Sequence, residues 1–187
     1  MRRRLIIEII LVLAVTFGSS GLRSCLKLID ALLTAPLNEQ STTLVQPSSS
    51  VSWLDLALQL TSAGTLMAWG ALAWFLLGSR WCWPKWRDLA HGAGLAAAIG
   101  LPGLAFYVAA VHLGLSKVVV PATDAVQIPT SLIWAFANGF GEEVVVVAYL
   151  VTRLLQLGAH PWQVVAASAV LRGSYHLYQG VSAGLGN

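Results

Sequence analysis

Two adjacent glutamates, Glu142 and Glu143, stand directly ahead of four valines in an otherwise apolar stretch. A positioned carboxylate can take a proton from water, and a histidine can accept or donate a proton near neutral pH. The later segment "LRGSYHLYQG" supplies such a histidine, His176, together with Arg172. We therefore predict that Glu142, Glu143 and His176 form a catalytic group, able in principle to activate water.

The apolar surroundings make this glutamate pair costly. An acidic side chain at the centre of a membrane helix costs about 2.5–3.5 kcal/mol, whereas each valine returns only about 0.3–0.6 kcal/mol. The four valines offset only part of that cost, so partners inside the bundle must supply the rest. Ionisable groups in such places usually face a cavity and mark function. The alternative is a pair neutralised by arginine that only fixes helix packing.

Helical geometry separates the two glutamates. At about 100° per residue, Glu142 shares a face with Asn138, Tyr149 and Arg153, whereas Glu143 points about 100° away. We expect Glu142 to face the site and Glu143 to support it. Asn138, Tyr149 and Arg153 are then candidate supporting residues on the same helix.

The next helix offers a complementary face. Arg172, His176 and Gln179 follow one another at offsets of four and three residues, which places them on one side of a helix. The turn "GAHPW" between the two helices is five residues long. Antiparallel helices joined by short loops pack directly against each other. Arg172 is therefore a further supporting candidate, close to the glutamates.

Composition predicts the architecture that must position these residues. The chain has 187 residues, of which 57% are hydrophobic and 10% charged, against about 25% charged residues in a soluble domain. We predict an all-α, polytopic transmembrane helix bundle with the lipid bilayer as a partner, and no nucleic-acid binding, because no basic cluster alternates with stacking aromatics. Stretches of about 20 apolar residues predict five spans: Leu5–Leu26, Trp53–Leu77, His91–Leu113, Pro129–Leu157 and Trp162–Tyr178.

Lysine and arginine placement predicts the orientation in the cell membrane. A cytoplasmic N-terminus puts most cations inside, namely Arg2, Arg3, Arg4, Arg80, Lys85, Arg87 and Arg153. Arg23 and Lys27 fit this rule less well, because they lie near the outer end of the first span. The first segment also has features of a cleaved signal peptide, although Glu8 within its apolar stretch argues against that interpretation.

The segment from Ile128 to Asn187, with "EEVVVVAYLVTRL" and "LRGSYHLYQG", resembles the CPBP family of CAAX proteases and bacteriocin-processing enzymes, in particular its actinobacterial members. The first family motif is a glutamate pair followed four residues later by arginine. The second is an aromatic residue four positions before a histidine. By this resemblance, Glu142 matches the glutamate that activates water, Glu143 stands beside it, and His176 matches the histidine that helps to hold the water.

Three positions depart from the family pattern. Val147 stands in place of the first-motif arginine, and Arg172 stands in place of the second-motif aromatic residue. An arginine on a neighbouring turn or helix, either Arg172 or Arg153, is expected to compensate. The third motif, a histidine followed four residues later by asparagine or aspartate, has no match before Asn187. In the family a later helix supplies the groups that stabilise the oxyanion, and losing such a donor costs about 10²–10³ in rate.

The resemblance implies intramembrane hydrolysis of a peptide or a prenylated protein by glutamate-activated water, without a cofactor. Zinc is a lesser alternative, because the sequence lacks the two-histidine HExxH spacing of metalloproteases. We expect residues 1–187 to form one transmembrane domain, a fragment lacking later helices, with the family-like motifs in residues 128–187. The alternatives are a proton-coupled transporter that uses Glu142 and His176 as a relay, and a non-catalytic membrane immunity or partner factor.

Overall fold

A computed structural model describes residues 2–43, 45–78, 85–120 and 127–186. Arg80 and Asn187, which the sequence analysis named, lie outside these ranges. Most of the described chain is helical, and two three-residue strands form a small parallel pair. The elements are α1 (Arg2–Val15), α2 (Phe17–Thr34), η1 (Leu37–Glu39), β1 (Ser41–Thr43), α3 (Ser52–Leu77), α4 (Trp86–His112), β2 (Val118–Val120), α5 (Gln127–Glu142), η2 (Glu143–Tyr149), α6 (Leu150–Gln156), α7 (Pro161–His176), η3 (Leu177–Gln179) and α8 (Val181–Gly186).

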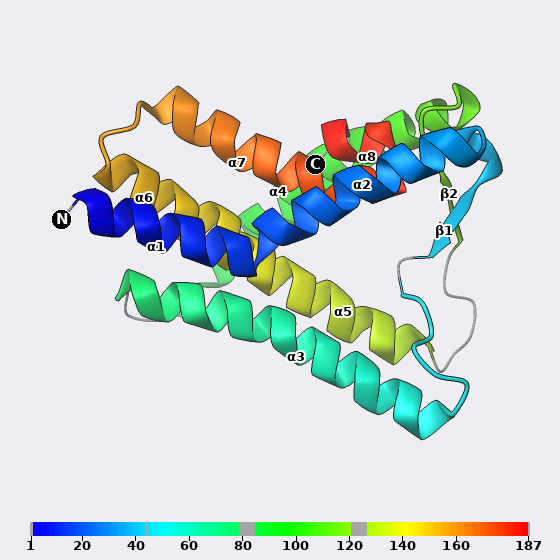
Figure 1. Ribbon diagram of the computed structural model, residues 1–187, viewed down its shortest axis with the longest axis horizontal. Helices are drawn as coiled ribbons and strands as arrows, with labels where there is room; N and C mark the ends of the chain where they lie inside the picture. The colour runs from blue at the N-terminus through cyan, green and yellow to red at the C-terminus, as the bar shows by residue number, and fades with distance from the viewer. Residues whose placement is uncertain (1, 44, 79–84, 121–126, 187) are drawn as a thin grey trace.

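The helices gather at one end of the molecule and diverge toward the other. Near the N-terminus, α1, α6, α7 and the end of α3 lie together (Figure 1). At the opposite end, α3 and α5 form one arm, and α2 lies in the other arm with α4 and α8 (Figure 1). The strands β1 and β2 lie at this open end, with Ser41 paired to Val118 and Thr43 to Val120. The predicted all-α helix bundle is confirmed, with this short strand pair as an addition.

The first predicted span is bent by 48° between α1 and α2. The Thr16 hydroxyl donates a hydrogen bond to the Val12 carbonyl at 2.7 Å, and the hydroxyls of Ser19 and Ser20 donate to the Thr16 carbonyl. Threonine and serine side chains that bond back to the preceding turn bend helices, and kinks occur at Gly/Ser pairs. The segment "TFGSS" therefore ends one straight helix and starts another, which leads α2 away from α1.

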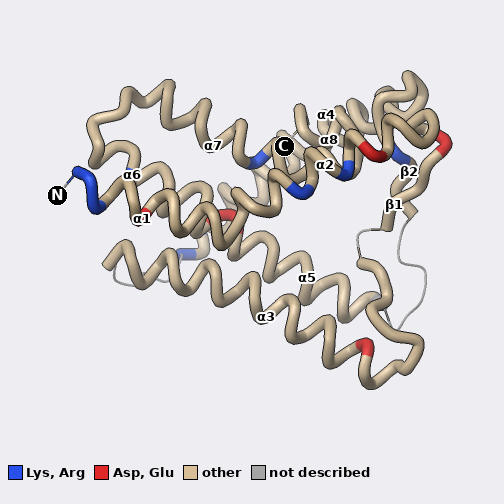
Figure 2. Tube along the Cα trace, in the orientation of Figure 1, with Lys and Arg blue, Asp and Glu red and all other residues tan. Residues whose placement is uncertain are grey.

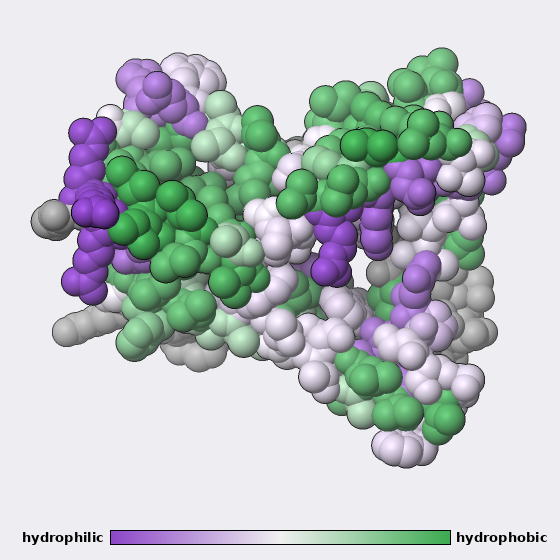
Figure 3. All heavy atoms as spheres, in the orientation of Figure 1, coloured by the Kyte–Doolittle hydropathy of each residue, from purple (hydrophilic) through white to green (hydrophobic). Residues whose placement is uncertain are grey.

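Three described helical stretches are long and apolar enough to cross a membrane: Ser52–Leu77, Trp86–His112 and Ile128–Gln156. The bent pair of α1 and α2 makes a fourth if it counts as one span. The fifth prediction, Trp162–Tyr178, corresponds to α7, whose 16 residues fall short of the about 20 that a bilayer core requires. Among the described residues, three of the five predicted spans thus correspond to helices long enough to cross a membrane, and the first corresponds to the bent pair. Many large apolar side chains are exposed, and they cover much of the face shown in Figure 3, as expected of a multi-pass membrane protein.

The core lies where α1, α2, α3, η2 and α7 meet. Its fully buried members include Val145, Val146 and Tyr149 from η2 and Ala73 from α3, and the ring of Phe17 packs between the rings of Trp69 and Tyr175. Small residues let α3 and α5 approach closely. A Cβ on Gly141 would lie 3.2 Å from the Leu66 carbonyl oxygen of α3. This contact fixes the backbone immediately before Glu142.

Candidate active site

The glutamate pair lies at a change of helix type. Glu142 is the last residue of α5, and Glu143 begins η2, a seven-residue π-helical segment. Pi-helical segments replace i→i+4 hydrogen bonds by i→i+5 bonds, and they occur frequently at functional sites. The four valines after the glutamates belong to this segment, and three of them are buried. Because these valines are packed in the core, they fix the backbone directly after the two glutamates.

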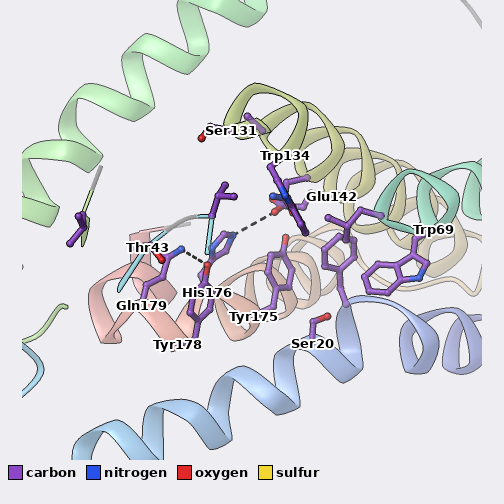
Figure 4. Close-up of a pocket in the computed structure, with 16 residues that line it drawn as sticks. Ser20, Thr43, Trp69, Ser131, Trp134, Glu142, Tyr175, His176, Tyr178 and Gln179 are labelled. Atoms are coloured by element: carbon purple, nitrogen blue, oxygen red, sulfur yellow. Dashed lines mark hydrogen bonds and ion pairs between the residues drawn. The ribbon is translucent and has the colours of Figure 1, made fainter. Parts of the chain in front are cut away.

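Helix α7 brings His176 and Arg172 to the glutamates. The Nε2 atom of His176 lies 3.8 Å from Oε1 of Glu142 (Figure 4). Arg172 reaches both carboxylates, since its Nη2 lies 3.7 Å from Glu142 Oε2 and 2.5 Å from Glu143 Oε1. The residues expected from the sequence to approach one another across the two helices therefore do so.

The two glutamates occupy different environments. The side chain of Glu142 is 17% exposed, whereas that of Glu143 is 61% exposed. Arg172, which lies between them, also interacts electrostatically with the Tyr175 hydroxyl. The arginine that stands opposite the pair is thus Arg172 from the neighbouring helix. Val147, where the family pattern has an arginine, is 39% exposed.

Glu142 and His176 line a cavity of about 580 Å³ between the two arms. Its wall combines aromatic and aliphatic side chains with a few polar groups, which is typical of sites for organic ligands. Figure 4 shows the carboxylate of Glu142 and the ring of His176 directed toward each other within it. The lining residues are Phe17, Ser20, Thr43, Val45, Leu66, Trp69, Val120, Ser131, Trp134, Ala135, Asn138, Glu142, Tyr175, His176, Tyr178 and Gln179.

Hydrogen bonds fix several of these wall residues. The indole of Trp134 donates from Nε1 to Oε1 of Gln59, a buried glutamine of α3, at 2.6 Å. The Tyr178 backbone N–H donates to the Ser24 hydroxyl of α2 at 2.6 Å. The Gln179 side-chain amide donates to the Tyr178 hydroxyl at 2.7 Å. The cavity wall is therefore tied to both arms of the molecule.

The four residues predicted to share one polar face of the fourth span lie in two separate environments. Asn138 and Glu142 line the cavity. Tyr149 and Arg153 instead contact Glu8 of α1, through a Tyr149 hydroxyl bond of 3.1 Å and an Arg153 Nε bond of 2.9 Å to the same carboxylate oxygen. The projection at 100° per residue fails because η2 separates the two pairs, and a π-helical turn contains more residues than an α-helical one. Tyr149 and Arg153 therefore do not approach the cavity.

Potential metal ligands do not cluster among the described residues. No group of three or more histidine, cysteine, aspartate or glutamate side chains in this part of the chain has an arrangement that could hold a metal ion. Glu143 points to Arg172, and neither nitrogen of His176 has a hydrogen-bond partner among the described atoms. The side chains present offer a proton acceptor, an imidazole and a guanidinium.

Sequence reasoning did not assign several residues of the cavity. Ser20, Trp69 and Trp134 come from three different helices. They come together only through the packing of α2, α3 and α5. Tryptophan and serine are common in membrane helices, so nothing in their spacing distinguished these three. The clearest signal near them is Gln59, an amide within an apolar span, which lies outside the cavity lining and accepts a hydrogen bond from Trp134.

Comparison with known proteins identifies one family model over the part of the chain that holds these residues. Residues 124–186 match the family model described as type II CAAX prenyl endopeptidase Rce1-like. The match includes both glutamates, Arg172 and His176, and it confirms the family resemblance stated for residues 128–187. No curated protein and no solved structure matches the chain.

Proposed function

Because residues 124–186 of this multi-pass membrane protein match the Rce1-like family of CAAX prenyl endopeptidases, we propose that it hydrolyses peptide bonds within the membrane by means of a water activated by Glu142. The observation that carries the proposal is the pair of Glu142 Oε1 and His176 Nε2, 3.8 Å apart on the wall of one cavity. Intramembrane proteolysis is the activity of the family. The glutamate mechanism and the assignment of residues are our proposal.

The proposed reaction begins with one water between Glu142 and His176. Their separation exceeds a direct hydrogen bond, and a bridging water can satisfy two polar groups at such a distance. Glu142 takes a proton from this water as general base. At the same time the water oxygen forms a bond to the carbonyl carbon of the peptide. The tetrahedral intermediate then collapses as the C–N bond breaks. The proton held by Glu142 passes to the leaving nitrogen, which departs as an amine.

Arg172 is proposed to act as a positioning residue. Two adjacent carboxylates repel each other, and a nearby cation favours their charged forms. Arg172 contacts both, yet its shorter contact is to Glu143, the more exposed one. Glu143 thereby holds the guanidinium in place and leaves Oε1 of Glu142 directed toward His176. In this arrangement Glu142 acts on the water and Glu143 positions Arg172. The different exposure of the two side chains agrees with this division.

The substrate class follows from the cavity wall. Trp69, Trp134 and Leu66 offer apolar contacts, and the cavity lies among helices that we assign to the membrane. An apolar peptide segment, or a peptide carrying a prenyl group, fits such a wall better than a charged one. We propose the cell membrane as the location, with a cytoplasmic N-terminus, since the three arginines at the start of α1 lie at the end of the bundle where α3 ends (Figure 2).

Cleavage by the purified chain in lipid nanodiscs tests this proposal. The substrates are internally quenched apolar peptides, with and without an S-farnesyl cysteine, and mass spectrometry identifies the new termini. The wild type should cleave, Glu142→Gln should lose about 10²–10⁴ in rate, as expected for a general base, and the exposed control Glu39→Gln should match the wild type. A chelator should leave the rate unchanged.

Three results would overturn the proposal. Cleavage that survives Glu142→Gln would remove Glu142 from the chemistry. Solute or proton flux that requires Glu142, without any peptide product, would instead favour the transporter. Loss of activity with a chelator and recovery with zinc would replace the metal-free mechanism.

A further inference from the structure

Tyr175 of α7 has a hydroxyl that the proposed mechanism does not use. The residue is only 7% exposed, and its hydroxyl makes no hydrogen bond to any atom of the described residues. Buried polar groups are paired in most proteins, because an unpaired one destabilises the fold. An unpaired hydroxyl on the wall of a cavity is therefore available to an acceptor that a ligand brings.

This hydroxyl lies beside the proposed position of the water. Tyr175 lines the cavity together with Glu142 and His176. Figure 4 shows its hydroxyl directed toward the carboxylate of Glu142, and the hydroxyl interacts electrostatically with Glu142 and Arg172. A peptide whose carbonyl carbon reaches a water between Glu142 and His176 would bring its carbonyl oxygen to this part of the wall.

Packing holds the ring of Tyr175 in place. The ring centroid of Phe17 from α2 lies 4.7 Å from that of Tyr175, and the ring centroid of His176 lies 4.8 Å from it. A donor stabilises a transition state most effectively when its position is fixed before the reaction. A tyrosine hydroxyl carries its proton at neutral pH. Tyr175 thus offers a fixed hydrogen-bond donor next to the general base.

We propose that Tyr175 is a further catalytic residue, whose hydroxyl donates a hydrogen bond to the carbonyl oxygen of the scissile peptide; this inference rests on the proposed function. When the water oxygen bonds to the carbonyl carbon, the π electrons of the C=O bond move to the carbonyl oxygen, which becomes an oxyanion. They return when the C–N bond breaks, and the tyrosine O–H bond stays intact throughout. Hydrogen bonds to charged acceptors are stronger than those to neutral ones. The hydroxyl therefore stabilises the intermediate more than the substrate, which raises the rate.

Removing only the hydroxyl tests this inference. At matched concentrations of folded protein, Tyr175→Phe keeps the ring and should lower kcat about 10²–10³-fold with little change in KM, as for the loss of one oxyanion donor. Its thermal unfolding midpoint should equal or exceed that of the wild type, because the lost hydroxyl had no partner. Wild-type kinetics in this variant would overturn the inference and leave the proposed function intact.

A matched control removes a tyrosine hydroxyl that has a partner. The hydroxyl of Tyr107 in α4 accepts a hydrogen bond from the Val119 backbone N–H at 2.8 Å. Tyr107→Phe should therefore lower the unfolding midpoint and keep kcat, the opposite of the pattern expected for Tyr175→Phe. Equal loss of kcat in both variants would show that the effect is not specific to the cavity, and would overturn the inference.

Binding in the non-cleaving Glu142→Gln background separates a direct contact from an effect through Glu142. The probes are two fluorescent apolar peptides of one sequence in phosphatidylcholine nanodiscs, one with an ordinary amide and one with a phosphinate, whose charged tetrahedral group mimics the oxyanion. Tyr175→Phe should weaken binding of the phosphinate at least tenfold more than binding of the amide. Equal losses, or none, would overturn the inference. Absence of cleavage by the wild type, with this difference present, would instead count against the proposed function alone.

Discussion

Removing Arg153 should destabilise the protein more than any exposed charge does, because its guanidinium links three helices. Arg153 of α6 pairs with Glu8 of α1 through Nε and donates to the Leu76 carbonyl of α3 and to Gln156. The side chains of Arg153 and Glu8 are only 11% and 20% exposed. Deleting one partner of such a buried pair costs about 3–5 kcal/mol, because the other charge stays buried without compensation.

The magnitudes follow from the contacts of each side chain. Arg153→Met should lower the free energy of unfolding by about 3–5 kcal/mol. Glu8→Gln should cost less, because the amide can still accept from Tyr149 and Arg153 keeps its bonds to Leu76 and Gln156. The double variant should be more stable than the sum of the two losses implies, by about 1–3 kcal/mol, as for residues in direct contact.

Reversible unfolding in mixed micelles, followed by tryptophan fluorescence during titration with sodium dodecyl sulfate, measures these differences. Arg87→Met and Glu39→Gln are matched controls at exposed positions, and each should change stability by less than about 0.5 kcal/mol. Losses that add in the double variant would show that Glu8 and Arg153 do not interact. A loss for Arg153→Met no greater than for Arg87→Met would refute the reasoning.

Two further predictions concern the glutamate pair and the orientation. Arg172→Glu should reduce both cleavage and thermal stability, because it places a third carboxylate beside two others, and adding Glu143→Arg should recover part of the stability; a double variant no better than the worse single would contradict the pairing. A reporter fused to the N-terminus, active only in the cytoplasm, should be active in cells, and activity confined to a reporter that requires export would reverse the proposed orientation.

The sequence predicted the approach of Glu142, His176 and Arg172 because each is costly in an apolar helix. Such residues need polar or charged partners. A five-residue turn makes the two helices direct neighbours, so the partners are expected on the adjoining helix. The same reasoning identified Asn138 as a member of the site, one turn before Glu142. These expectations used local spacing and the cost of burying charge, whereas the depth at which Glu142 and His176 meet depends on helix tilt, which the sequence does not fix.

The remaining features arise from backbone deviations and distant packing. The π-helical segment after Glu142 turned Tyr149 and Arg153 away from the cavity, and neither propensity nor periodicity reveals an i→i+5 turn in a run of valines. Glu8 found its partner Arg153 across 145 positions of sequence, which spacing does not predict. The segment "TFGSS" indicates a bend near Thr16. It does not indicate the direction in which α2 continues, so the position of Ser20 in the cavity wall could not be predicted.

A double-mutant cycle on cleavage rates tests most directly whether Glu142 and His176 act together on one water. Initial rates are compared for the wild type, Glu142→Gln, His176→Phe and the double variant, all in nanodiscs at matched concentrations of folded protein. Residues that act as a unit lose nearly the full effect when either is removed, so the double variant should be about as slow as Glu142→Gln alone. Rate losses that multiply, or a His176→Phe variant as fast as the wild type, would contradict the account.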